Sequence, residues 1–309
     1  MKAIAQAPSK VIITGEHFVV HGSWALAAAI GKKVTAEVEA SDKLSVDSGL
    51  FQGSSPSALL PVSKVVRSMA KRFAFSPDIR VSISSEVPGG AGLGSSASTM
   101  VAVSAAVSKL RSLDLKTKQL AECAMVGEEE VHGRPSGIDA AVCAHGGVLL
   151  FRPGSEPRGV RFEGERRVLV VLSGSSRSTK RLVGHVASVK AGLPAYFAGL
   201  ADSAGDLASL AAERLQEGDM KGLGRLLTYN HAVLSAMGVS TPGLDQLVDL
   251  LLSLECYGAK LTGAGGGGSV LAVAEEGKEK RIISEVSKRG FEAFACVIPV
   301  GGVKSWLRP

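Results

Sequence analysis

The part of this chain that most constrains its fold is a glycine-rich segment at residues 88–98, with the sequence PGGAGLGSSAS. It follows a predicted strand at 79–83 and precedes a predicted helix of small residues at 96–110. Glycine lets a backbone approach an anion closely, and the first turn of a helix offers unpaired N–H groups and the positive end of its dipole. The hydroxyls of Ser95 and Ser96 suit phosphate oxygens or Mg²⁺. Taken alone, the segment indicates a phosphate-binding loop and a glycine-rich turn with a serine N-cap about equally.

Strands and helices are mixed along the chain without a regular βαβ repeat, so the sequence predicts an α+β fold rather than a doubly wound sheet. The basic stretch 152–167, which contains Pro and Gly, is the best boundary candidate and divides the chain into domains at 1–160 and 161–309. The predicted strands are residues 10–14, 34–40, 79–83, 146–151, 168–172, 259–262, 270–274 and 291–298. The predicted helices are residues 59–73, 96–110, 116–130, 178–190, 194–216, 219–236, 242–256 and 277–289.

The charge and the cysteines of the chain argue against several classes of protein. The 309 residues carry a formal charge of +6, but residues 151–190 alone hold nine Lys or Arg and three acidic residues. A basic excess confined to one segment indicates a local anion site or a solvated face rather than a track for nucleic acid. The four cysteines form no CxxC pair, which argues against a zinc site and a disulfide framework. The first residues lack the apolar core of a secretory signal, and no apolar run reaches the ~20 residues of a membrane span. We therefore expect a cytoplasmic protein that does not enter a membrane.

Other patterns match known site motifs only in part. Residues 263–268, with the sequence GAGGGG, fit the dinucleotide-binding pattern GxGxxG, but a strand is predicted where that motif needs a helix. No GxxxxGK[ST] segment occurs, which excludes a P-loop. Glu128 and His132 are four residues apart on a predicted helix but lack the rest of an HExxH motif. His132 is therefore more simply a structural histidine than a metal ligand.

A second group of polar residues surrounds a predicted turn at 133–137. Glu128 lies near the end of a predicted helix, and Asp139 follows the turn, which contains Gly and Pro. A rigid turn that brings these carboxylates together would let a magnesium ligand and a proton acceptor share one site. The alternative is a solvated helix end, with Asp139 as the N-cap of the next element. Spacing alone favours that alternative.

Three segments, in this order, resemble the motifs of the GHMP small-molecule kinases. They are residues 7–22 (APSKVIITGEHFVVHG), the 88–98 loop and residues 260–269 (KLTGAGGGGS). The three together are highly specific, and the likeness runs from about residue 7 to residue 275. Within the family, the chain is most similar to the branch that phosphorylates mevalonate. That similarity rests on residues 15–17 (GEH), 132–139 (HGRPSGID), 177–180 (RSTK) and 261–268 (LTGAGGGG).

The resemblance implies an architecture of two domains with the active site in the cleft between them. The N-terminal domain would be similar to ribosomal protein S5 and would carry the 88–98 loop. The C-terminal domain would be ferredoxin-like and would carry the second glycine-rich loop at 262–269. The glycines of that second loop would let the backbone approach the active site without a side-chain clash.

The resemblance also implies a reaction and assigns residues to it. ATP with Mg²⁺ would donate its γ-phosphoryl group to the primary hydroxyl of mevalonate, by direct in-line transfer, in isoprenoid biosynthesis. Asp139 would be the catalytic base and Lys10 its cationic neighbour, while Ser96 and Glu128 would hold Mg²⁺. The ATP phosphates would be wrapped by Gly90, Ala91, Gly92, Leu93, Gly94, Ser95 and Ser96. The substrate contacts would be Glu16, His17, Ser178, Thr179 and Gly265.

Two positions depart from the family pattern. Ser9 stands where the family usually has glycine, and a serine there would strain the backbone if the position needs a positive φ. Phe18 is bulkier than the usual small residue, so we expect it to reshape the substrate pocket.

Other functions stay open at this stage. The basic residues Arg177, Lys180 and Arg181 keep a phosphomevalonate kinase open. Another GHMP kinase and a non-catalytic nucleotide-binding regulator are further alternatives, and nucleic-acid binding is the weakest one. The sequence also leaves the oligomeric state open, a homodimer included.

Overall fold

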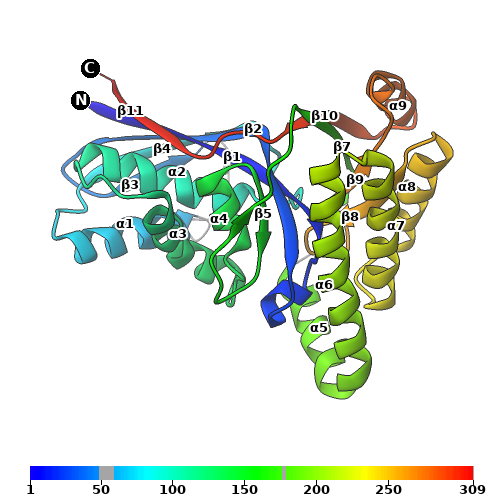
Figure 1. The fold of residues 1–309 in the computed structure, drawn as a ribbon. Coiled ribbons are helices and arrows are strands. Elements are labelled where there is room, and N and C mark those ends of the chain that lie inside the picture. Colours follow the sequence, from blue (N-terminus) through cyan, green and yellow to red (C-terminus); the bar gives the residue numbers. More distant parts are fainter. Residues whose placement is uncertain (49–58, 176–178, 309) are drawn as a thin grey trace.

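The computed structural model describes residues 1–48, 59–175 and 179–308, without the side chains of Thr179 and Lys180. Within these ranges the chain forms two sheets, each with its own helices, that lie side by side (Figure 1). The mixture of helices and strands confirms the predicted α+β class. The chain passes from the first sheet to the second between β6 (Arg158–Gly159) and β7 (Arg166–Leu172), and its last strand, β11 (Lys304–Arg308), returns to the first sheet.

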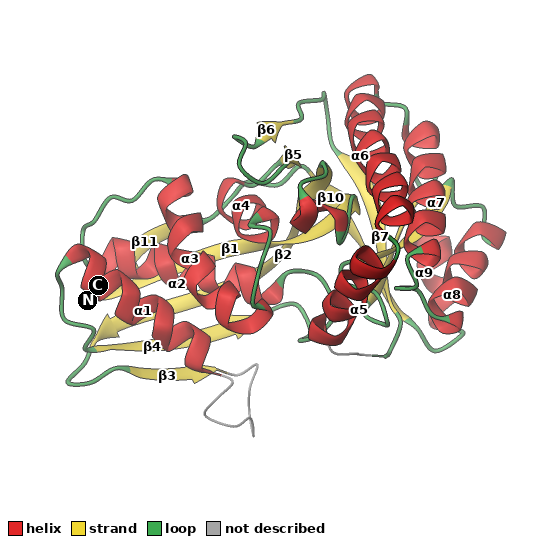
Figure 2. Cartoon of the chain, turned by 90° about the horizontal axis from the view of Figure 1, so that it is seen from below, coloured by secondary structure: helices red, strands yellow, loops and turns green. Residues whose placement is uncertain are grey.

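The first sheet is built around the long strand β2 (Ala25–Ala40), which pairs with β1, β4 and β5. Its strand order is β11-β1-β2-β4-β3, and β3 and β4 are parallel. The remaining strands of this sheet are β1 (Lys2–Thr14), β3 (Ser45–Ser48), β4 (Ile79–Ser85) and β5 (Val148–Phe151). One face of the sheet is covered by α1 (Leu60–Phe73), α2 (Ser95–Leu110), α3 (Thr117–His132) and α4 (Ile138–His145) (Figure 2). Because β11 pairs antiparallel with β1, the two ends of the chain lie side by side (Figure 1).

Helix α2 forms the buried centre of this half. Twelve of its 16 residues are buried, and most of them are Ala, Ser or Val. Small side chains allow a helix to pack closely against its neighbours, and α2 contacts β1, β2 and the other three helices of this half. At its start, the Ser98 hydroxyl donates to the Pro8 carbonyl at 2.9 Å. This packing fixes the N-terminus of α2, and with it the glycine-rich loop, against β1.

The second sheet has the strand order β10-β7-β9-β8. Its strands besides β7 are β8 (Gly258–Thr262), β9 (Ser269–Val273) and β10 (Glu292–Ile298). Its helices are α5 (Thr179–Gly192), α6 (Pro194–Glu217), α7 (Met220–Ala236), α8 (Pro242–Ser253) and α9 (Glu279–Ser287). Side-chain caps set two of the helix starts, since Asp219 accepts from Gly222 N before α7 and Thr241 accepts from Leu244 N before α8. The division at 160/161 stays a prediction.

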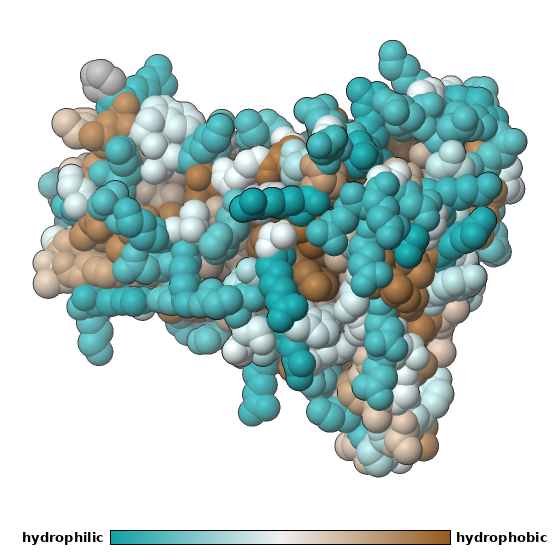
Figure 3. Space-filling model, in the orientation of Figure 1, coloured by the Kyte–Doolittle hydropathy of each residue, from teal (hydrophilic) through white to brown (hydrophobic). Residues whose placement is uncertain are grey.

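Hydrophilic residues cover most of the face shown in Figure 3. The end of the molecule formed by α5 and α6 is lighter and more apolar in that view, and Leu193 and Tyr196, where these helices join, are exposed. Across the described ranges, every helix is too short or too polar to cross a membrane.

Candidate functional site

A cavity of about 390 Å³ lies where the two halves of the molecule meet. Its wall brings together the end of β1, the 88–98 loop, the end of α3, the start of α4 and the second glycine-rich loop. Ala91 and Leu93 are buried within the loop and do not line the cavity. Ser178 lies outside the described residues, and so does the side chain of Thr179. The predicted site residues that line the cavity are Lys10, Glu16, His17, Gly90, Gly92, Gly94, Ser95, Ser96, Glu128, Asp139 and Gly265.

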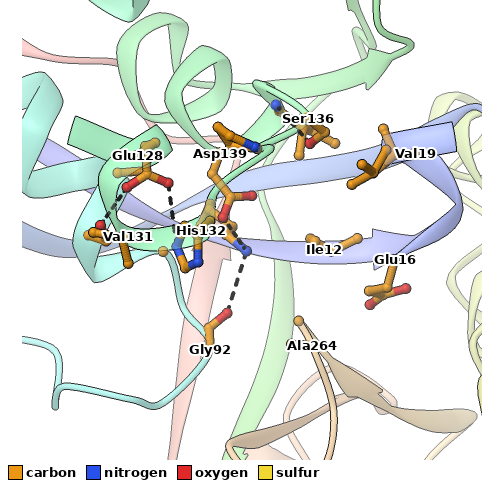
Figure 4. Close-up of a pocket in the computed structure, with 18 of the residues that line it drawn as sticks. Ile12, Glu16, Val19, Gly92, Glu128, Val131, His132, Ser136, Asp139 and Ala264 are labelled. Carbon is orange, nitrogen blue, oxygen red and sulfur yellow. Dashed lines mark hydrogen bonds and ion pairs between the residues drawn. The ribbon is translucent and has the colours of Figure 1, made fainter. Parts of the chain in front are cut away.

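Asp139 lies in the middle of the cavity wall (Figure 4) and forms an ion pair with Lys10, with 3.1 Å between Lys10 Nζ and Asp139 Oδ2. The Lys10 side chain is 3% exposed, whereas that of Asp139 is 30% exposed and therefore accessible from the cavity. Lys10 is fixed at both ends, because its backbone N–H donates to the Leu93 carbonyl at 3.0 Å and its ammonium group donates to the Gly92 carbonyl at 3.4 Å. Asp139 lies in the first turn of α4, where the helix dipole stabilises a negative charge.

A second carboxylate, that of Glu128, lies deeper than Asp139. It accepts a hydrogen bond from the Ser96 hydroxyl at 2.5 Å, and its other oxygen is 3.7 Å from His132 Nε2. Burial raises the pKa of Glu128 to about 7, and the nearby charge of Asp139 acts in the same direction. The hydrogen bond from Ser96 and the charge of Lys10 oppose that rise in pKa. Burial also lowers the pKa of His132, so the site places a carboxyl group and a neutral imidazole together.

The donor set at Ser96 and Glu128 fits Mg²⁺. A hydroxyl and a carboxylate are the oxygen ligands that this hard cation prefers, and it commonly keeps waters and substrate phosphates as its other ligands. Within the described ranges, no cluster of three or more His, Cys, Asp or Glu side chains forms a metal site made of protein alone. An ion held by Ser96 and Glu128 would take its other ligands from waters and phosphate oxygens.

The 88–98 loop reaches the N-terminus of α2 through glycines with positive φ. Gly90, Gly92 and Gly94 have φ values of +77°, +76° and +74°, which side chains rarely adopt. At Gly94 the space is also limited, because an added Cβ would lie 2.7 Å from Cγ of Lys10. The loop therefore needs glycine both for its left-handed backbone and for its close contact with Lys10. Ser95 and Ser96, which follow the glycines, are the first residues of α2.

The second glycine-rich loop packs directly against the first. Ser269 Oγ donates to the Ala91 carbonyl at 2.6 Å, and an added Cβ at Gly263 would lie 3.1 Å from the Gly92 carbonyl oxygen. At Gly265, with φ of +75°, an added Cβ would lie 2.2 Å from the Val239 carbonyl oxygen. The two glycine-rich loops therefore line one cavity.

Glu16 lies at the other end of the cavity from Glu128, with Asp139 between them (Figure 4), and His17 is the next residue in the chain. The His17 ring is 2.9 Å from the Ala264 carbonyl through Nε2. Because a carbonyl only accepts, Nε2 carries the proton and Nδ1 is left as an acceptor in the neutral ring. Burial lowers the pKa of His17, which favours that neutral form. Glu16 is 1% exposed and bonds to Lys260 and Asn230.

The departures at residues 9 and 18 do not disturb this site. Ser9 lies in β1 and is not one of the non-glycine residues with positive φ, so the serine causes no backbone strain there. Phe18 is fully buried and packs against Phe197 of α6, with 5.6 Å between ring centroids. The expectation that Phe18 reshapes the substrate pocket is wrong, because Phe18 is not among the residues that line the cavity and its bulk is accommodated in the core.

Sequence reasoning assigned no role to Lys260, although it lies in one of the quoted motifs. The sequence pattern that could have singled it out is a lysine within the short strand segment GAKLT, which is β8 and is buried throughout. Buried lysines require a partner. The sequence does not indicate that this partner is Glu16, because 244 residues separate the two.

Two family models match the chain: the GHMP kinases N-terminal domain over residues 61–147 and the GHMP kinases C-terminal domain over residues 211–292. The mevalonate kinase of Aeropyrum pernix is 35% identical, with 98% of each chain covered. The mevalonate kinase of Thermococcus sibiricus is 36% identical, with 94% of each chain covered. The crystal structure of L. major mevalonate kinase in complex with R-mevalonate is 28% identical, covers 96% of each chain and has a TM-score of 0.82. The chain therefore belongs to the GHMP kinase family and, within it, to the mevalonate kinases.

Proposed function

We propose that this chain transfers the γ-phosphoryl group of ATP to the primary hydroxyl of mevalonate, with Mg²⁺ as cofactor, as a step of isoprenoid biosynthesis. The observation that carries the proposal is the Lys10–Asp139 ion pair, which lies beside the glycine-rich loop and the first turn of α2. The choice of mevalonate as the acceptor rests on the names of the similar proteins, which are mevalonate kinases.

Asp139 would accept the proton of the acceptor hydroxyl. An alcohol has a very high pKa, so this transfer occurs late, as the new O–P bond forms. Lys10 would stabilise the negative charge that develops on the acceptor oxygen, since its ammonium group is 3.1 Å from the Asp139 carboxylate. Its buried side chain and its bond to the Gly92 carbonyl keep the charge at that position without reorganisation.

The phosphates would lie on the 88–98 loop, at the N-terminus of α2. Phosphoryl transfer depends mainly on positioning and on neutralising charge. Ser96 and Glu128 would hold Mg²⁺, which when bound neutralises charge on the β- and γ-phosphate oxygens. Ser96 lies in the first turn of α2, which the Ser98–Pro8 hydrogen bond attaches to β1. The hydrogen bond between Ser96 and Glu128 keeps the two oxygen donors together.

The end of the cavity beside Glu16 and His17, which we call the acceptor end, suits a small acceptor with hydroxyl and apolar groups. Ile12, Val19 and Val20 give it apolar walls. The unprotonated Nδ1 of His17 is an acceptor for a hydroxyl group, and Gly265 allows backbone approach. Glu16 lies beside His17 but with little accessible surface.

The first test is ADP release measured in parallel with mevalonate, phosphomevalonate, homoserine and galactose. We expect turnover with mevalonate that is abolished by EDTA, and turnover with phosphomevalonate alone would favour the alternative kinase. Asp139→Asn should lower kcat by about a thousandfold or more while the affinity for ATP changes little, because the carboxylate acts only on the acceptor proton. The exposed Glu129→Gln serves as the control. Loss of ATP affinity with an unchanged kcat in Asp139→Asn would contradict the assigned role.

We also infer a cytoplasmic location, where ATP is available. The four cysteines are free and buried, which supports a reducing compartment.

A further inference from the structure

A buried ion pair joins the two halves of the molecule next to the acceptor end of the cavity. Lys260 of β8 is 0% exposed, and its ammonium group bonds to Oε1 of Glu16, which follows β1. The same ammonium group donates to the Ile12 carbonyl at 3.3 Å. Thr262, two residues along β8, binds both backbone groups of Ile12 through its hydroxyl, at 3.1 Å to the nitrogen and 3.0 Å to the oxygen. The end of β1 is thus attached to β8 by side chains.

The second carboxylate oxygen of Glu16 is also occupied. Asn230 of α7 donates to Oε2 at 3.0 Å, so both oxygens have donors from the C-terminal half. The next residue, His231, fixes α7 against β8, because its Nδ1 accepts from Leu261 N at 3.3 Å and its Nε2 donates to Asp245 at 3.1 Å. Glu16 is therefore held between two elements that are themselves joined.

The segment held in this way has an unusual backbone. Gly15 has φ of +94°, and an added Cβ there would lie 2.5 Å from the Trp24 carbonyl oxygen. His17, which is not a glycine, has φ of +59°. Such a conformation persists only when the surroundings determine it. Glu16 lies between these two residues, so its bonds to Lys260 and Asn230 hold the turn that directs the His17 ring to the Ala264 carbonyl.

We propose that Lys260 is a positioning residue for the acceptor: through Glu16 it fixes the 15–17 turn and thereby the orientation of His17 at the acceptor end of the cavity. The proposal rests on the proposed function, since it needs mevalonate as the acceptor. Lys260 acts through Glu16 and His17, and Glu16 serves in it as an anchor rather than as a group that the substrate must reach.

The test compares Lys260→Met, Glu16→Gln and the double variant. Each single change leaves one buried charge without its partner, so both should lower Tm. The double variant removes both charges of the pair, so it should regain most of that Tm. Its KM for mevalonate should still be raised about tenfold or more, because the ionic link to the turn is missing, while its KM for ATP stays within about twofold. The control is Lys278→Met, which removes a partly exposed, ion-paired lysine of the same half and should change neither KM.

Two results would overturn the inference. One is a double variant with restored Tm and an unaltered KM for mevalonate, which would make the pair structural only. The other is an equal rise of both KM values, which would indicate general damage to the cavity. If the unaltered chain released no ADP with mevalonate, the proposed function itself would be wrong. If the unaltered chain were active and the double variant had the same KM for mevalonate, only this inference would be refuted.

Discussion

The titration of Glu128 should make the stability of the metal-free chain depend on pH. The pKa of Glu128 is about 7 in the folded chain against an ordinary value of 4.5. Because this pKa is raised, the folded state holds a proton between these values that the unfolded state has released, so stability falls as pH rises through that window. At about 1.4 kcal/mol per pH unit, the loss between pH 5 and pH 8 is about 2 to 3 kcal/mol.

Glu128→Gln removes this titration and keeps the shape of the side chain. The Tm of the unaltered chain minus that of the variant should therefore be larger at pH 5 than at pH 8. Unfolding entropy averages about 2 cal/mol/K per residue, so for a chain of 309 residues the change in that difference is about 4 °C. Scanning calorimetry in the presence of EDTA measures it. Glu129→Gln, an exposed neighbour on α3, should show the same Tm difference at both pH values.

The prediction is wrong if the Tm of the unaltered chain minus that of Glu128→Gln is constant with pH or grows towards pH 8. A constant difference would mean that Glu128 does not hold a proton near neutral pH in the folded chain. A difference that grows with pH would mean that the folded site favours the ionised carboxylate, so that Lys10 and Ser96 outweigh burial and Asp139.

Two further predictions concern single side chains. Gly94→Ala should raise the KM for ATP about tenfold or more, because the added Cβ would lie 2.7 Å from Lys10 Cγ at a positive φ that alanine rarely adopts. The control is Gly89→Ala in the same loop. Its added Cβ meets open space, so the KM for ATP should stay nearly unchanged. Equal steady-state KM values for the two variants would contradict this view of the loop. Ser9→Ala should raise the free energy of unfolding by about 1 kcal/mol, because the buried hydroxyl has no hydrogen-bond partner within the described ranges. Urea unfolding that shows a less stable Ser9→Ala chain would refute that account.

The elements with a strong local pattern were predictable from the sequence, and those that depend on distant partners were not. The helix predicted at 96–110 is α2, Ser95–Leu110. The strand predicted at 34–40 is only the second part of β2, because residues 25–30 are buried on both faces and so show no alternation. Strand β11 is exposed along its whole length and is a strand because β1 offers it a free edge. No local signal marks such a segment.

For the site, the motifs predicted many of the residues that line the cavity, although not Ala91 and Leu93, which are buried within the loop, and they did not predict how the lining residues are held. The glycine-rich segments and the Lys10, Ser96, Glu128 and Asp139 set meet in one place. Spacing alone favoured a solvated end of α3, yet Glu128 is buried against Ser96. The ion pair between Glu16 and Lys260 depends on how the two sheets meet, which local sequence patterns do not encode.

The two carboxylates of the site differ in environment rather than in kind, and this difference supports their separate roles. Glu128 is buried, so its charged form is costly until a cation compensates it. Asp139 has an ammonium group at 3.1 Å, lies in the first turn of a helix and is open to the cavity. A group that must accept a proton from an incoming hydroxyl has to be charged and accessible before the reaction, whereas a metal ligand has to be charged only when the metal is present. Exchanging the roles would make the base a side chain that is only 3% exposed, whereas Asp139 is 30% exposed to an incoming hydroxyl, so the burial pattern itself favours Asp139 as the base and Glu128 as the ligand.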